Sequence, residues 1–191
     1  TLSPLRTGPI PMPPPTPGDQ VQRYSPTGVP ALPGDGPGAL PGHVGPPGAD
    51  ALVQAMEFRR GTEGRASAVG RIDVGTAAAF DDFLNTQGDE LTVLVLHSPG
   101  GSVRDAIAMS RALRKKGIAT EVPTNGYCAS SCPLVFAGGV RRTVGEPAWL
   151  GVHQVFTVGD ETGTVSDGLA GGQRISAEVL ALLVDMDIDA A

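Results

Sequence analysis

The sequence predicts an α/β domain with a mostly parallel sheet, preceded by an N-terminal arm rich in proline and glycine. Residues 93–96 form an uninterrupted apolar run, which is typical of a strand buried on both faces of a parallel sheet. A strand–turn–helix pattern recurs three times, and each turn at the strand's carboxyl end is polar or glycine-rich. Residues 1–50 hold 14 of the 18 prolines and 9 of the 27 glycines.

The composition divides the chain into an arm, residues 1–50, and a domain, residues 51–191. The arm carries too few apolar side chains to offset the entropy of ordering it, so we expect a disordered tail or linker with polyproline II character. The remaining residues, roughly 140, are enough for one hydrophobic core. A long spacer before a compact domain also suits a domain tethered to a membrane outside this chain, although no run of about 18 apolar residues is present.

Periodicity and turn residues predict the elements of the domain in order. Two short strands flank a Gly-Thr-Glu-Gly turn, and a helix follows them. The buried strand then ends at a Ser-Pro-Gly-Gly-Ser turn that leads into an amphipathic helix. We expect strands within 51–60, 65–74, 90–98, 118–125 and 148–156, helices within 75–88, 103–117, 132–139 and 173–188, and a glycine-rich loop over 157–172.

Charge and composition exclude several classes of function. The net charge is −6, aromatic residues make up 4% of the chain, and the two short basic clusters at 114–116 and 141–142 are expected to be solvated surface. A nucleic-acid partner is therefore not expected, because neither a basic stripe nor a stacking platform is present. The chain has no phosphate-binding loop and no second Cys/His pair beside its two cysteines, so no cofactor, ATP site or metal site is predicted.

The segment at 125–139 concentrates the chemically interesting side chains. Ser130 and Ser131 lie between Cys128 and Cys132, immediately before Pro133. Serine followed by proline is a common start of a helix, so a capping role is the simplest reading of this stretch alone. A serine at a strand-to-helix junction is also the position of an activated nucleophile, which needs a base and an oxyanion hole.

Candidates for both of these parts exist elsewhere in the chain. Of the three histidines, His43 lies in the arm, His97 closes the buried strand, and His153 lies in a strand after the serines. A histidine in a strand is more often a hydrogen-bonded core residue than a base. Gly100 and Gly101 follow the buried strand, and their amides can point together at one oxygen, although most such turns are only turns.

Three separated motifs together resemble the proteolytic subunit of the Clp protease and its uncharacterised periplasmic relatives, over roughly residues 67–154. They are the Ser-Pro-Gly-Gly turn, the segment around the two cysteines, and the His-Gln pair at 153–154. The resemblance implies a Clp protease/crotonase-like fold of stacked β-β-α units. It also implies Ser130 as nucleophile, His153 as base, and oxyanion amides at Gly100, Gly101 and Ser131.

The chain departs from the family pattern in two respects. Cys128 and Cys132 replace small residues, and they are compatible either with a disulfide in an oxidising compartment or with two small buried thiols. A disulfide here would place Ser130 under redox control, as a hypothesis. The acid of the family's triad lies well beyond the base, and Asp160, Asp167 and Asp185 do not match its position. We therefore expect either a chain that stops short of this residue at its C-terminal end or a catalytic dyad.

The leading prediction is a serine hydrolase, and specifically a peptidase that needs no ATP itself. It would act on a peptide or protein, assemble as a homo-oligomer, and work in the periplasm or as a membrane-anchored extracytoplasmic protein. The first alternative is a non-catalytic binding module of the same fold at the cell envelope. The second is an acyl-thioester enzyme of the crotonase type, which shares the paired amides but has no serine nucleophile.

Overall fold

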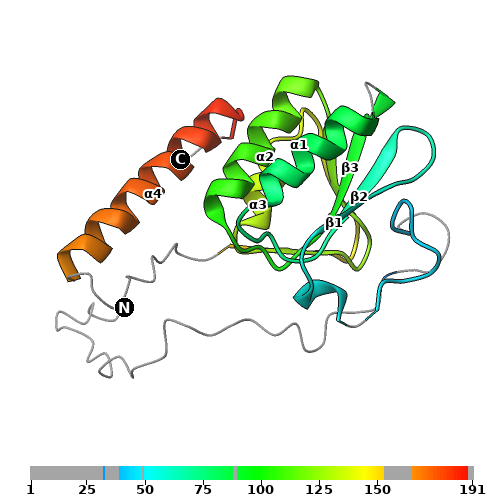
Figure 1. Ribbon diagram of the computed structural model, residues 1–191, viewed down its shortest axis with the longest axis horizontal. Helices are drawn as coiled ribbons and strands as arrows, with labels where there is room; N and C mark the ends of the chain where they lie inside the picture. Colours follow the sequence, from blue (N-terminus) through cyan, green and yellow to red (C-terminus); the bar gives the residue numbers. More distant parts are fainter. Residues whose placement is uncertain (1–31, 33–38, 49, 88–89, 153–164, 189–191) are drawn as a thin grey trace, which may run out of the picture.

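The computed structural model describes residues 32, 39–48, 50–87, 90–152 and 165–188. Its main feature is a five-stranded sheet in the order β1-β2-β3-β4-β6, covered on one face by helices (Figure 1). Only β1 and β2 are antiparallel, and the other neighbours in this sheet run parallel. The predicted α/β architecture with a mostly parallel sheet is confirmed.

The elements follow one another in alternation, after a short 3-10 helix at Ala51–Val53. The strands of the main sheet are β1 (Glu57–Arg60), β2 (Arg65–Val69), β3 (Val93–His97), β4 (Ala119–Val122) and β6 (Arg142–Val144). A separate parallel pair consists of β5 (Tyr127–Ala129) and β7 (Trp149–Gly151). The helices are α1 (Thr76–Gln87), α2 (Val103–Lys116), α3 (Cys132–Ala137) and α4 (Val165–Asp185).

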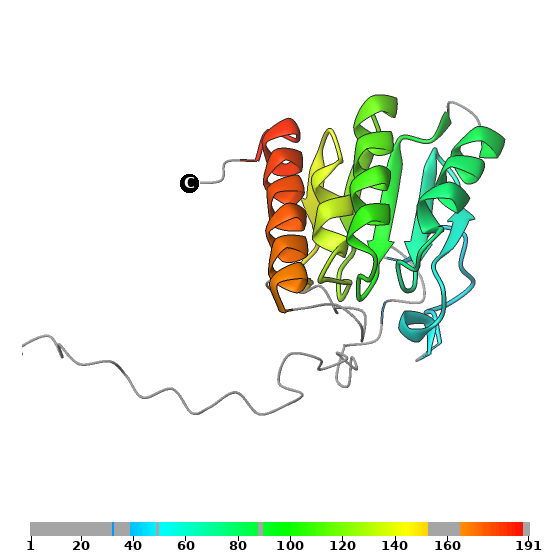
Figure 2. The ribbon, with the colours of Figure 1, turned by 60° about the vertical axis from the view of Figure 1, so that its left-hand side comes forward.

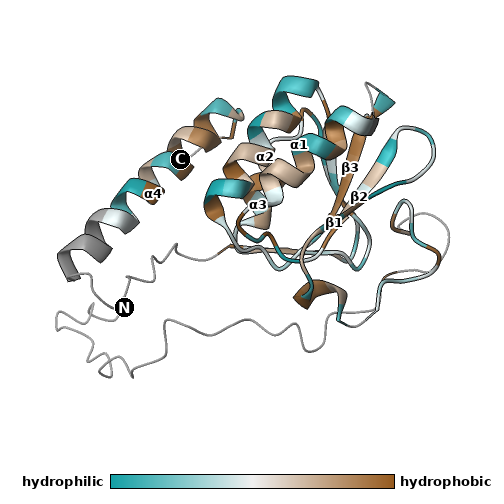
Figure 3. Ribbon diagram, in the orientation of Figure 1, coloured by the Kyte–Doolittle hydropathy of each residue, from teal (hydrophilic) through white to brown (hydrophobic). Residues whose placement is uncertain are grey.

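Strand β3 lies at the centre of the sheet and is buried along its whole length, as its apolar run predicts. Figure 3 shows this strand as a continuous hydrophobic segment. Because successive side chains of a strand point to opposite faces, Leu94 and Leu96 enter the large core beneath the helices. Val93 and Val95 enter a second, smaller core on the other face.

The second core includes residues of the N-terminal arm. Leu32 and Leu40 are 5% and 3% exposed and pack with Val69, Val93 and Val95. The hydroxyl of Ser67 donates to the Pro41 carbonyl oxygen at 2.7 Å. The packed structure therefore includes residues before Ala51, because the helices cover only one face of the sheet and these leucines bury apolar surface on the other.

Helix α4 stands at one end of the row of helices, beside α3 (Figure 2). Arg114 of α2 and Arg142 of β6 each donate to the Met186 carbonyl oxygen, at 2.8 and 2.9 Å. These two arginines thus hydrogen-bond the end of α4. Lys115, Lys116, Arg141 and Arg142 are nevertheless exposed, as the sequence predicts for the two basic clusters. The helix also begins at Val165 rather than at Gln173, so the expected glycine-rich loop is helical from residue 165 onward.

Among the described residues, none of the helices has the length and apolar character that crossing a membrane requires.

His97, at the end of β3, is a neutral core residue. It is 4% exposed, and its Nδ1 accepts a hydrogen bond from the Tyr127 amide at 3.1 Å. Burial, together with the nearby His43, lowers the pKa of His97 to about 4. Its imidazole is therefore uncharged at neutral pH, with the remaining proton on Nε2.

This burial predicts that acid destabilises the fold. The unfolded chain binds a proton at His97 near pH 6.5, and the folded chain binds it only near pH 4. The contribution of His97 to the free energy of unfolding is therefore constant above about pH 6.5. Below that pH, protonation of His97 in the unfolded chain lowers the free energy of unfolding by about 1.4 kcal/mol per pH unit, until about pH 4. His43, whose pKa is also lowered by burial, acts in the same direction, so the wild type is compared with His97→Asn. In urea unfolding, the wild type should lose about 2 kcal/mol more than the variant between pH 6.5 and pH 5. Parallel pH curves for the two proteins would contradict the assignment.

Candidate active site

Ser130 occupies the turn between strand β5 and helix α3. Its backbone φ is +61°, a left-handed conformation that non-glycine residues rarely adopt. The Ser130 amide donates to the Gly151 carbonyl oxygen at 2.9 Å, so the turn is tied to the end of β7. The residue is partly exposed. A strained strand-to-helix turn is also where the nucleophile elbow of α/β-hydrolases holds its serine.

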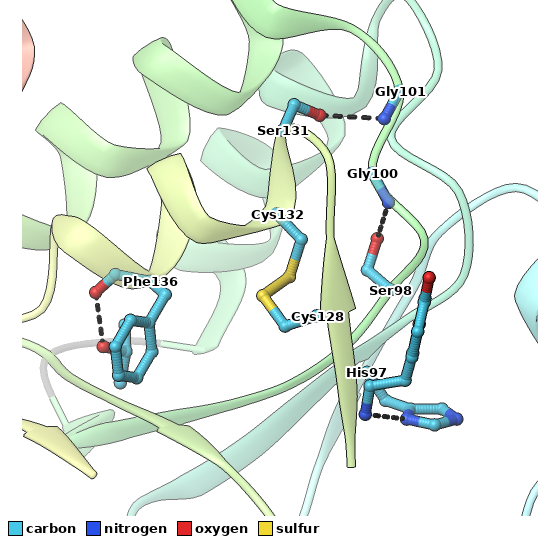
Figure 4. The surroundings of a disulfide bond; sticks show 10 residues. His97, Ser98, Gly100, Gly101, Cys128, Ser131, Cys132 and Phe136 are labelled. Atoms are coloured by element: carbon cyan, nitrogen blue, oxygen red, sulfur yellow. Dashed lines mark hydrogen bonds between the residues drawn. A yellow bond between two sulfur atoms is a disulfide. The ribbon is translucent and has the colours of Figure 1, made fainter. Parts of the chain in front are cut away.

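The two cysteines enclose this turn as a disulfide. Cys128 lies in β5 and Cys132 is the first residue of α3, and their sulfur atoms are bonded (Figure 4). The Cα atoms are 5.2 Å apart, and both residues are almost fully buried. Of the two arrangements that the sequence leaves open, the structure has the disulfide. This is possible at a sequence separation of 4 because the intervening Ser130 is not helical.

The Ser-Pro-Gly-Gly turn follows β3 and lies directly against the Ser130 turn. Gly100 and Gly101 have φ values of +85° and +145°, which only glycine adopts readily. A Cβ atom added at Gly100 would lie 2.7 Å from both the Ser130 Cβ and the Ser131 nitrogen. The two turns therefore touch through backbone atoms, and the structure brings together four of the predicted site residues.

The amides of the two glycines point in different directions. The Gly100 amide donates to the buried Ser98 hydroxyl at 3.1 Å, within its own turn. The Gly101 amide donates across to the Ser131 hydroxyl at 2.8 Å (Figure 4). Of the two glycine amides predicted for an oxyanion hole, only that of Gly101 thus faces the Ser130–Ser131 turn.

Ser131 occupies the N-cap position of α3 without capping it. Its hydroxyl makes no capping hydrogen bond to its own helix, although its carbonyl oxygen accepts from the Leu134 amide at 3.0 Å. The hydroxyl is directed to Gly101 instead. The sequence predicts either a capping role or an oxyanion amide for Ser131, and it does not predict this side-chain contact, because a local pattern does not show a bond between residues 30 positions apart.

A second serine fixes the other end of the glycine turn. The Ser102 hydroxyl accepts from the Asp105 amide at 3.2 Å and so caps α2. Burial opposes the charged form of Asp105, but hydrogen bonds from Ser102 and from the amides of Ala77 and Gly75 outweigh it and lower the pKa of this carboxyl. An ionised Asp105 therefore joins the starts of α1 and α2 beside the glycine turn.

The predicted base, His153, lies outside the described residues, as does Asp160. The strand that leads to His153 is described: β7 runs parallel to β5, and Gly151 is paired with Ala129. Asp167 and Asp185 belong to α4, and Asp185 is exposed near the end of that helix. The structure thus places the predicted nucleophile, Ser130, and the glycine turn together.

Of the other two histidines, one lies in the core and one beside a cavity. His97 is a hydrogen-bonded core residue, as described above. His43 lines a cavity of about 490 Å³ that is formed by residues 42–48 and by parts of 50–59 and Val69. Ser130, Gly100 and Gly101 are not part of its lining. Among the described residues, no group of three histidine, cysteine, aspartate or glutamate side chains could hold a metal ion.

Comparison with known proteins gives partial likenesses. No protein-family model matches the chain. No curated protein matches it either. A mutant of 1510-N, a membrane-bound stomatin-specific protease, aligns over 62% of this chain and 65% of its own, with 12% identity and a TM-score of 0.41. DspI of Pseudomonas aeruginosa aligns over 71% of this chain and 63% of its own, with 13% identity and a TM-score of 0.40. The chain therefore spans just under two thirds of the length of each, and these likenesses assign no role to any of its residues.

The disulfide should contribute to stability and to the order of the serine turn. Closing a loop with a sequence separation of 4 stabilises the fold by about 2 kcal/mol in the chain-entropy model. Reductant should lower the free energy of unfolding of the wild type by this amount and leave that of a Cys128→Ala/Cys132→Ala protein unchanged.

If the conformation of Ser130 depends on the disulfide, reductant also changes the rate at which a serine probe labels the wild type. Unchanged stability and labelling, after thiol titration has shown full reduction, would contradict both expectations.

Proposed function

We propose that this protein is a serine hydrolase, specifically a peptidase, with Ser130 as its nucleophile. One observation carries the proposal: Ser130 has a left-handed backbone in a strand-to-helix turn that is packed directly against the Gly100–Gly101 turn. A strained non-glycine residue costs about 1–3 kcal/mol and persists only where the surrounding structure holds it in place. Such residues are found mainly at functional sites. Here β7 and the disulfide supply that surrounding structure.

In the proposed mechanism, the Ser130 hydroxyl attacks the carbonyl carbon of the scissile bond while His153 takes its proton. The negative charge that develops on the carbonyl oxygen is bound by the amides of Gly101 and Ser131. His153 then donates its proton to the leaving amine, and an acyl group remains on Ser130. A water molecule, activated by the same histidine, hydrolyses this ester and regenerates the serine.

Chain connectivity supports His153 as the base. The Ser130 amide is bonded to the Gly151 carbonyl oxygen, and His153 follows Gly151 by two residues in the sequence. Since two residues span at most about 7 Å, the chain can bring the imidazole within reach of the Ser130 hydroxyl. The resemblance of the surrounding motif to that of Clp proteases gives His153 the same role.

A peptide substrate is supported by the resemblance and by the surface of β7. Trp149 and Leu150 of β7 and Val152, just after this strand, are 55%, 46% and 80% exposed. Strand β7 is paired with β5, which ends immediately before Ser130. Exposed apolar side chains next to a site suit a substrate with apolar groups. The disulfide supports an oxidising, extracytoplasmic compartment for the protein.

The second candidate function is a non-catalytic binding module. The observation that favours it is the state of the glycine turn, in which the amides of Gly100 and Gly101 both donate to serine hydroxyls. In a binding module, these bonds would only stabilise the turn. The two functions differ in whether Ser130 reacts with an electrophile.

A fluorophosphonate probe tests the proposal on the folded protein. The wild type should be labelled at Ser130, as identified by mass spectrometry of the labelled peptide, and Ser130→Ala should not be labelled. In His153→Ala, labelling should slow by about 10²-fold or more, because the general base is lost. Ser176→Ala serves as the matched control, since Ser176 is an exposed serine on α4. Absence of labelling in a folded wild type would support the binding module, and labelling at another serine would contradict the assignment.

A further inference from the structure

The Ser131 side chain occupies the position where a substrate oxygen is expected to bind. Its hydroxyl oxygen lies 2.8 Å from the Gly101 nitrogen and accepts the hydrogen bond of that amide. Donors of an oxyanion hole lie 2.7–3.1 Å from the oxygen that they stabilise. The hydroxyl thus takes the place of a ligand oxygen on this amide, as Figure 4 shows.

The hydrogen bond from Gly101 to Ser131 determines whether the Gly100–Gly101 turn can bind a substrate. An amide has a single hydrogen, so Gly101 cannot donate fully to a substrate while it donates to Ser131. Gly100 offers no substitute, because its amide is directed to the Ser98 hydroxyl inside the turn. In this conformation, both glycine amides have internal acceptors.

The Ser131 hydroxyl has no capping role in α3 that would hold it at this position. Its helix receives no hydrogen bond from this side chain, and the backbone at Ser131 (φ −84°, ψ −11°) is unstrained. A serine side chain can change its rotamer without movement of the backbone. Ser131 is 2% exposed, so its hydroxyl lies in the protein interior and is not in contact with bulk solvent.

We propose that the Ser131 hydroxyl is an internal ligand of the oxyanion hole, which closes the site at rest and is displaced by the carbonyl oxygen of the substrate. This inference rests on the proposed function, and it adds a regulatory role for a side chain beside the nucleophile. A neutral carbonyl oxygen competes with the hydroxyl on nearly equal terms. An oxyanion forms a charge-assisted bond, roughly twice as strong as a neutral one, and so it displaces the hydroxyl. Displacement breaks the hydrogen bond between Gly101 and Ser131 whichever oxygen replaces the hydroxyl, so the side chain raises the barrier of the reaction as well as weakening the binding of substrate.

The rate of fluorophosphonate labelling tests this role, because the phosphoryl oxygen of the probe needs the same amide. Ser131→Ala removes the competing hydroxyl and keeps the backbone amide, so labelling of Ser130 should accelerate by about threefold to tenfold. Ser176→Ala controls for the loss of a serine hydroxyl elsewhere.

The outcomes separate this inference from the proposed function. Labelling of Ser130 in the wild type, with an equal or slower rate in folded Ser131→Ala, overturns the inference and leaves the hydrolase standing. Labelling of Ser130 in Ser131→Ala but not in the wild type supports both the inference and the proposed function. Absence of labelling in both proteins overturns the proposed function, and the inference with it.

A second measurement needs no variant at position 131. In a crystal structure of the wild-type fluorophosphonate adduct, the phosphoryl oxygen should lie about 3 Å from the Gly101 nitrogen, with the Ser131 side chain in another rotamer. An adduct in which the Ser131 hydroxyl still accepts from Gly101 overturns the inference, even if Ser131→Ala fails to fold.

Discussion

The close contact between the glycine turn after β3 and the serine turn after β5 is the constraint on which the candidate site depends. A Cβ at Gly100 would also overlap the Ala129 carbonyl oxygen, and one at Gly101 would overlap the Ile72 carbonyl oxygen. The glycine turn is thus enclosed by backbone on two sides. Only residues without a Cβ, with positive φ, allow this approach. The approach in turn gives Gly101 its contact with Ser131.

The rest of the fold holds the two turns at this distance. Central strand β3 carries the glycine turn and is buried on both faces, so its end is fixed in position. The serine turn is fixed at three points: the disulfide, the bond from Ser130 to Gly151, and the packing of α3 on α2. Gly138, the C-cap residue of α3, makes that packing possible, because a Cβ there would overlap the backbone of Ser110. Several independent contacts can therefore hold Ser130 in a conformation that it would not adopt alone.

The sequence predicted the parts of this arrangement that depend on local patterns. The apolar run of β3, the glycine turn and the short helix after the cysteines are each visible in a few consecutive residues. The contacts that close the site are not local. The bond from Gly101 to Ser131 joins residues 30 apart, and the arginines that bind Met186 are separated from it by 72 and 44 positions. The burial of Leu40 similarly depends on which sheet face the helices leave uncovered.

The central claim is that the fold holds Ser130 in a strained conformation, and substitution of this residue by glycine and by alanine tests it most directly. Both variants lack the hydroxyl, so the difference in their free energies of unfolding reports the backbone. Because a left-handed backbone penalises alanine, Ser130→Gly should be more stable than Ser130→Ala by about 1 kcal/mol. At Ser176, inside α4, the order should be reversed by about the same amount, since glycine is the poorer helix former. If alanine is the more stable residue at position 130 as well, Ser130 is not strained and the account of the site is contradicted.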